Sequence, residues 1–66
     1  MLDKLAIIRK RKGMTQDALS RASGIHRVNI AKYETGVCCP SMRNLERLAA
    51  ALGVTVSELL GEEKAG

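Results

Sequence analysis

Tryptophan and phenylalanine are absent from this 66-residue sequence, and Tyr33 is its only tyrosine. Sandwich and barrel folds rely on aromatic and β-branched residues, so the composition argues against either. The core must come from Leu, Ile, Val, Met and Ala, which favours packed helices. A chain this short forms one domain and buries only about 60% of the surface that its unfolded form exposes.

Cysteine occurs only as the adjacent pair Cys38 and Cys39. Neighbouring cysteines cannot close a long loop, and a bridge between them would be strained, so no disulfide framework is expected. This fits a reducing compartment. Buried or inert thiols are favoured over a redox role, because no feature that would lower a thiol pKa can be named. With His26 the pair would supply only three ligands, without the paired spacing of a zinc site, so we expect no metal and no cofactor.

Long apolar runs are also missing. No stretch approaches the roughly 18 apolar residues that read as a membrane span. The opening letters MLDKLAIIRKRKG place the positive charge after a short apolar stretch, which is the reverse of a secretory signal. These features predict a cytoplasmic protein without a membrane segment.

Charge is unevenly distributed along the chain. Residues 1–32 hold eight Lys or Arg and two Asp, a net of +6, whereas residues 33–66 hold three Lys or Arg and five Glu, a net of −2. A basic first half indicates a surface for a polyanion, although a solvated charged face would look the same.

Five helical segments are predicted. The first covers about residues 2–12 and ends before Gly13. The second starts from Thr15 as N-cap, with Ala18, Leu19 and Ala22 as its apolar side, and ends at Ser23-Gly24. The third runs from after Gly24 to Gly36, the fourth from the Ser41 cap to Gly53, and the fifth is TVSELL with a Thr55–Glu58 capping box. Residues 1–61 then form the domain, and residues 62–66 a polar, fraying tail.

The second and third segments are two short helices joined by a tight turn at Ser23-Gly24-Ile25. Gly24 can adopt a positive φ angle, which lets the chain reverse sharply, and Ile25 then returns to the core. This is the arrangement of a helix-turn-helix, whose second helix enters the DNA major groove.

The sequence resembles the λ-repressor/Cro-like helix-turn-helix family, also called the xenobiotic-response-element family. The matching text is IRKRKGMTQDALSRASGIHRVNIAKYETG, followed by PSMRNLERLAAALGVTVSELL. It covers about residues 2–60, and several independent features agree in order and spacing. The resemblance implies a compact five-helix domain that binds duplex DNA, usually as a symmetric dimer.

One face of the third helix is the expected groove face. At about 100° per residue, Ile30 and Tyr33 point opposite to Val28 and Lys32. Family contacts carried over by position fall on Arg27, Val28 and Lys32. Arg27 or Lys32 would donate to guanine, and Val28 would pack on a thymine methyl, unless the helix is rotated and Val28 is partly core.

Three further residues are expected at the phosphate backbone: Gln16, Asn29 and Arg43. The resemblance also implies that Gln16 supports the third helix, the recognition helix that enters the major groove. It implies in addition a structural ion pair between Arg9 and Glu34, because a partly buried carboxylate needs such a partner. His26 stands at the expected N-cap of the third helix, where the family usually has Ser or Thr, and either caps the helix or approaches a phosphate.

Two segments leave alternatives open. The loop VCCPS lacks the Lys, Arg or Asn that relatives place along the DNA backbone. Near the C-terminus, Val54, Val56 and Leu60 either form a dimer interface or simply close the small core.

The predicted function is a sequence-specific DNA-binding transcription regulator, and we expect it to be a repressor. It would act in the cytoplasm of a bacterium, bacterial or phage-encoded, as a homodimer on a palindromic operator at the nucleoid. The alternative is a protein-interaction module of the same fold, such as an antitoxin, with DNA binding secondary. An enzyme is not expected, because no paired carboxylates, activated nucleophile or phosphate-cradling loop is present.

Overall fold

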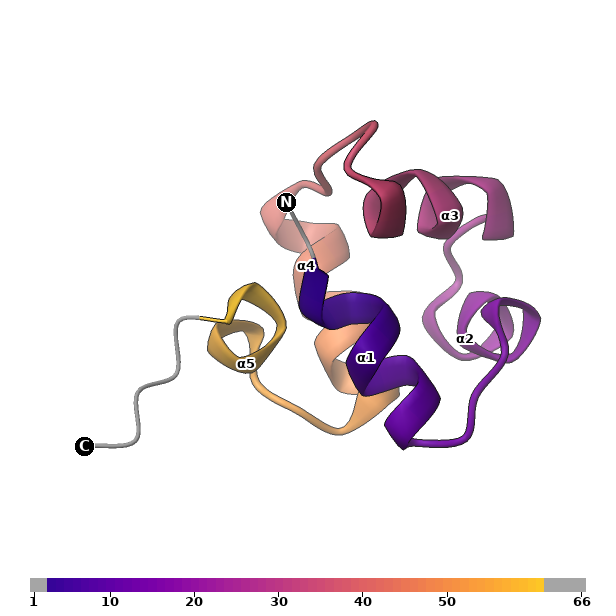
Figure 1. The fold of residues 1–66 in the computed structure, drawn as a ribbon, viewed down its shortest axis with the longest axis vertical. Helices are drawn as coiled ribbons and strands as arrows, with labels where there is room; N and C mark the ends of the chain where they lie inside the picture. The colour runs from indigo at the N-terminus through magenta and orange to yellow at the C-terminus, as the bar shows by residue number, and fades with distance from the viewer. Residues whose placement is uncertain (1–2, 62–66) are drawn as a thin grey trace.

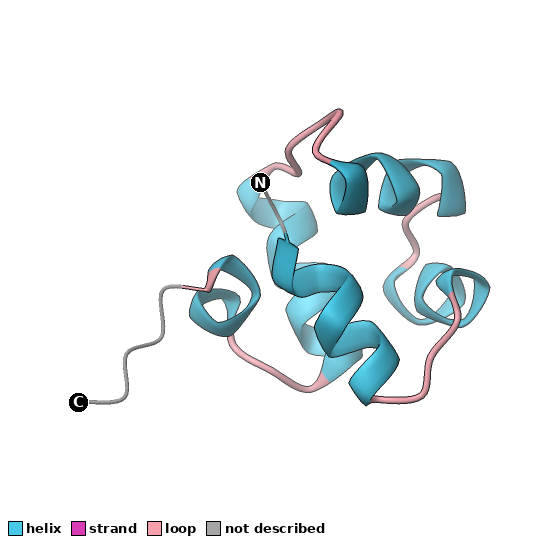
Figure 2. Cartoon of the chain, viewed as in Figure 1, coloured by secondary structure: helices cyan, strands magenta, loops and turns pink. Residues whose placement is uncertain are grey.

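A computed structural model describes residues 3–61, which form five helices joined by short loops (Figure 1; Figure 2). The helices are α1 (Asp3–Arg11), α2 (Gln16–Ser23), α3 (Arg27–Thr35), α4 (Met42–Leu52) and α5 (Val56–Leu60). The predicted all-α, five-helix fold is confirmed. The expected start of the first helix at residue 2 and the expected tail at 62–66 lie outside the described residues.

Side-chain caps fix three of the helix starts as the sequence predicts. Thr15 Oγ1 accepts a hydrogen bond from the Ala18 amide at 3.0 Å, and Ser41 Oγ accepts one from Asn44 at 3.3 Å. At α5, Thr55 and Glu58 form both bonds of a capping box. Each cap satisfies a backbone N–H that has no partner inside its helix, so the helix boundaries are encoded locally.

Every helix contributes one completely buried side chain to the core. These five residues are Leu5, Leu19, Ile30, Leu48 and Leu59. Burying a side chain of this size stabilises a fold by about 1.5–3 kcal/mol, so the core can form with Tyr33 as its one aromatic residue. The expected apolar side of α2 needs a correction at its last position. Ala22 is exposed, and Ser23 is buried in its place because the helix turns it toward the core before the chain reverses.

The helices are arranged so that α2 and α3 lie at one end of the domain and α5 at the other (Figure 1). Helix α2 packs against α3 and α4, while α1 contacts both α3 and α5. Among residues 3–61, no helix is long and apolar enough to cross a membrane. Because α1 and α2 both pack against α3, the fold holds α3 from two sides and leaves its remaining side at the surface.

Candidate nucleic-acid interface

The turn between α2 and α3 is held by local hydrogen bonds. Gly24 has φ +75°, a left-handed conformation that residues with a Cβ rarely adopt. Ser20 Oγ donates to the Ile25 carbonyl at 2.6 Å, and the Ile25 amide donates to Ser23 Oγ at 3.3 Å. Ile25 itself is buried. The short sequence Ser-Gly-Ile thus sets the angle at which α3 leaves α2.

Helix α3 has one buried and one exposed side. Ile30 and Tyr33 are buried, and the Tyr33 hydroxyl accepts a hydrogen bond from Asn44 Nδ2 on α4 at 3.1 Å. Val28 lies on the other side with 57% of its surface exposed, so it is not part of the core. Arg27 and Lys32 are exposed as well. The three residues expected to read bases are therefore all accessible, and the inward side is the predicted one.

A single carboxylate joins three helices behind this face. Arg9 Nε on α1 donates to Glu34 Oε2 at 2.7 Å, and Arg9 Nη2 reaches Glu34 Oε1 at 3.3 Å. Gln16 Nε2 on α2 donates to the same Oε1 at 3.0 Å. Arg9 Nη1 also donates to the Met14 carbonyl at 2.8 Å. Because the Arg9 and Glu34 side chains are only 10% and 9% exposed, little water competes for these bonds.

A shallow hollow of about 320 Å³ lies at the N-terminus of α2. Its lining residues are Arg9, Thr15, Gln16, Asp17 and Arg27. The positive end of the helix dipole and the exposed Arg27 guanidinium favour an anion at such a place, whereas the Asp17 carboxylate opposes one. The sequence did not reveal that Arg27 Nε lies 3.4 Å from Asp17 Oδ1 across this hollow. Both side chains are mostly exposed, so this ion pair is weak and can open.

The other residues expected at phosphates are also at the surface. Asn29 is exposed on α3, and Arg43 is exposed in the first turn of α4. Gln16 is half-buried and uses one N–H on Glu34, which leaves its second N–H for another acceptor. These positions place donors on three different helices.

His26 occupies the N-cap position of α3, but its side chain makes no capping hydrogen bond. Of the two alternatives expected for His26, a cap or an approach to a phosphate, the side-chain cap is therefore wrong. Its backbone carbonyl still accepts from the Ile30 amide at 3.1 Å, which starts the helix without help from the ring. The exposed ring is left for solvent or a ligand.

The loop between α3 and α4 also departs from expectation. Cys38 and Cys39 are free and exposed, so of the expected buried or inert thiols, the buried alternative is wrong. Val37, just before them, is 71% exposed. Gly36, at φ +83°, ends α3, and residues 36–39 are all exposed, so the side chains of this part of the loop lie outside the core.

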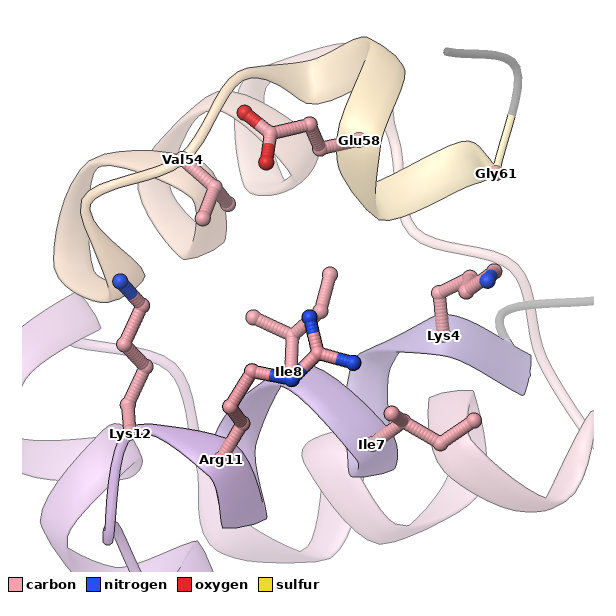
Figure 3. Close-up of a pocket in the computed structure, with 8 residues that line it drawn as sticks. All are labelled: Lys4, Ile7, Ile8, Arg11, Lys12, Val54, Glu58 and Gly61. Atoms are coloured by element: carbon pink, nitrogen blue, oxygen red, sulfur yellow. The ribbon is translucent and has the colours of Figure 1, made fainter. Parts of the chain in front are cut away.

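The C-terminal residues expected either at a dimer interface or in the small core lie in two environments. Val54 and Val56 are partly buried and pack against the core, whereas Leu60 is 36% exposed. Val54 also lines a groove of about 260 Å³ between α1 and α5. Figure 3 shows Lys12, Arg11 and Lys4 along the α1 side of this groove, with Glu58 opposite them. Helix α5, which forms one wall of this groove, lies at the other end of the domain from α3 (Figure 1).

Comparison with known proteins defines the class. A family model described as Helix-turn-helix matches residues 5–59. The chain belongs to this family, the xenobiotic-response-element group of helix-turn-helix proteins, as its resemblance predicted. The family is one of DNA-binding transcriptional regulators.

Three curated relatives are similar over most of the chain. The immunity repressor protein of Bacillus phage phi105 is 37% identical over 60 residues, which is 91% of this chain and 42% of the relative. The HTH-type transcriptional regulator AnsR of Bacillus subtilis is 38% identical over 63 residues, 96% of this chain and 54% of the relative. The cryptic phage CTXphi transcriptional repressor RstR of Vibrio cholerae is 37% identical over 59 residues, which is 89% of this chain and 53% of the relative. The chain thus spans about half the length of these relatives, and no solved structure matches it at a significant level.

Proposed function

We propose that this chain binds duplex DNA through α3 in the major groove and regulates transcription, as a repressor at a palindromic operator. The observation that carries the proposal is the exposed face of α3. Val28 lies there between two exposed cations, Arg27 and Lys32, while Ile30 and Tyr33 hold the helix from behind. An exposed valine beside two donors suits a base edge with a thymine methyl next to a guanine.

Phosphate contacts would position the helix on the duplex. The hollow at the N-terminus of α2 offers the positive helix end, the spare N–H of Gln16 and the nearby Arg27. Asn29 and Arg43 would contact phosphates on either side of the groove. Such contacts carry no sequence information, but they fix the register in which the base readers act.

A two-fold dimer completes the proposal. One helix reads too few base pairs for useful specificity, so two copies on a symmetric site are needed. Leu60 is exposed at the end of α5, and Ile7, 48% exposed, lines the adjoining groove. Val54 and Val56 already pack against the core, so we assign the dimer contact chiefly to Leu60 and the groove rim. Such a regulator would act in the bacterial cytoplasm, without catalytic activity.

A second candidate is a protein-interaction module of the same fold. Val37 and Met42 are exposed on the α3–α4 loop side, and this favours an apolar partner such as a toxin. The basic residues around α3 favour DNA instead. Binding of a nonspecific DNA duplex at low salt distinguishes the two candidate functions. A surface that binds only protein would not bind such a duplex.

Selection of bound duplexes from a random DNA pool tests the proposed function. It returns the half-site sequence, its symmetry and the half-site spacing together. We expect an inverted repeat with centres separated by about one helical turn, 10–10.5 base pairs, or a multiple of it. Recovery of an unenriched pool would contradict sequence-specific recognition, and an unrepeated single half-site would contradict the dimer.

A further inference from the structure

Three sulfur-bearing side chains lie close together in sequence at the α3–α4 loop and are all exposed. Cys38 and Cys39 are free thiols, and Met42, the first residue of α4, is 61% exposed. Cysteine and methionine are among the residues that folded proteins usually bury. Neither the readout of bases nor the contacts to phosphates uses these three side chains.

We propose that Cys38, Cys39 and Met42 form a binding site for a soft, thiophilic metal ion, Cu(I), and that the bound ion weakens the interaction with DNA. The second part rests on the proposed function of α3, whereas the first part stands without it.

The donor set selects the metal. Thiolate and thioether ligands are soft and prefer Cu(I), whereas Zn²⁺ sites use four ligands drawn from Cys, His and carboxylates. Among residues 3–61, no group of three His, Cys, Asp or Glu is placed to hold a metal. The sequence argues against a zinc site that would combine His26 with the two cysteines. Met42 adds a donor that such a site would not use.

Backbone geometry favours a metal bridge over a disulfide. The Cα atoms of adjacent residues lie about 3.8 Å apart, below the 4.4–6.8 Å usual for disulfides. A metal between the two sulfurs makes a larger ring, because each metal–sulfur bond is about 2.3 Å in thiolate sites such as those of zinc. The two sulfurs need not touch, and the strain of a direct bridge is avoided.

Met42 is the third donor of the proposed site, and it lies near the two thiols in the sequence. It follows Cys39 by three residues, so their Cα atoms are at most about 11 Å apart even in a fully extended chain. The Ser41 cap fixes where α4 begins, and this fixes the backbone position of Met42, the first residue of α4. The three rotatable bonds of the methionine side chain then let its sulfur approach the thiolates.

Binding changes the charge beside the recognition helix. Two S–H bonds break, two protons leave to solvent, and three Cu–S bonds form, two to the thiolates and one to the neutral Met42 thioether, with no change in oxidation state. The neutral thiol pair becomes a site with net charge −1. Residues 36–42 carry no other charge. The amides of Val37 and Cys38 donate to the Lys32 carbonyl at 3.0 and 3.3 Å, so the new charge is tied to the last turn of α3. A negative charge there repels phosphates and attracts Lys32, which competes with the base edges that Lys32 is proposed to read.

The test begins with an anaerobic titration of the reduced protein with Cu(I), in competition with bathocuproine disulfonate. We expect one Cu(I) per chain. Cys38→Ser and Cys39→Ser should each lower the affinity by more than the roughly 10–100-fold typical of losing an outer-shell partner. Met42→Leu should lower it measurably, whereas Met14→Leu, a change at a half-buried methionine outside the loop, should leave it unchanged. Wild-type affinity in any of the three loop variants, or one Cu(I) per two chains, would overturn the three-sulfur site.

The second arm measures DNA affinity by fluorescence anisotropy, with and without one equivalent of Cu(I). Loading should weaken binding of the wild-type protein by about three- to tenfold, the scale of losing one phosphate contact, and should leave the double variant Cys38→Ser/Cys39→Ser unaffected. Equal affinity of the loaded and metal-free wild type would overturn the regulatory part. Failure of the metal-free protein to bind any duplex would instead overturn the proposed function, and the titration would still decide the metal site.

Discussion

Arg9 and Glu34 are 25 positions apart in sequence, yet Arg9 Nε lies 2.7 Å from Glu34 Oε2 in a nearly buried ion pair. The bond connects α1 to the last turns of α3. Gln16 adds a third helix through the same carboxylate. The orientation of the recognition helix therefore depends on one acidic side chain that is not itself expected to touch DNA.

Replacement of Glu34 by Ala should destabilise the domain. The change leaves the Arg9 guanidinium buried without its counter-charge, and losing one partner of a buried pair typically costs about 3–5 kcal/mol. Chemical denaturation measures the loss of unfolding free energy. Glu46→Ala, at an exposed position of α4, is the matched control and should change stability by less than about 0.5 kcal/mol. Equal midpoints for both variants would show that the pair contributes nothing.

A serine at position 26 should stabilise the domain. His26 stands at the N-cap of α3 without a side-chain capping bond. His26→Ser supplies a hydroxyl that can accept an amide of the first turn, for a gain of about 0.5–1 kcal/mol. Thermal or chemical unfolding reports the gain, and His26→Ala separates the new cap from loss of the ring. If Ser and Ala give the same stability, the N-cap position does not limit the stability of α3.

Neutralising Asp17 should strengthen DNA binding. Its carboxylate lines the hollow at the start of α2 and pairs loosely with Arg27 at 3.4 Å. Asp17→Asn removes a charge that repels phosphate and frees Arg27, so the affinity for duplex DNA at low salt should rise several-fold. Anisotropy titrations measure the change, with Glu58→Gln at the far groove as the control. A loss of affinity would indicate that Asp17 orients Arg27 for its contact.

Truncation of Arg27 should relax sequence preference. If Arg27 reads a guanine, Arg27→Ala costs about 1–3 kcal/mol and weakens the preference at one position of each half-site. Competition titrations with single-base variants of the selected site reveal the position. Arg11→Ala removes the same charge in the groove between α1 and α5, away from α3, and should retain the full preference (Figure 3). Uniform weakening across all site variants would instead make Arg27 a phosphate contact.

Local signals in the sequence predicted the helices well. The helix caps are Thr15, Ser41 and the Thr55–Glu58 pair. Their hydrogen bonds join residues only three positions apart, so the local sequence encodes them. The inward positions of Ile30 and Tyr33 follow from helical periodicity in the same way. Structural features that depend on residues close together in the sequence could therefore be predicted.

Features that depend on how the helices pack were harder to predict. The bond from Asn44 to the Tyr33 hydroxyl and the ion pair of Arg27 with Asp17 join separate helices, and no spacing in the sequence marks them. The exposure of Cys38 and Cys39 depends on the path that the loop takes after Gly36, which composition does not reveal. The residues proposed to read bases could be named in advance only because the family resemblance aligned them.

Binding of a nonspecific duplex at two salt concentrations tests the central claim, that α3 and its surroundings form a DNA-binding surface. The account predicts clear binding at low salt that weakens steeply as salt rises, with a logarithmic slope of about −0.9 for each phosphate contact. It also predicts a shallower slope for Arg43→Ala, by about one contact. Absence of binding even at low salt, or affinity that does not respond to salt, would contradict the account.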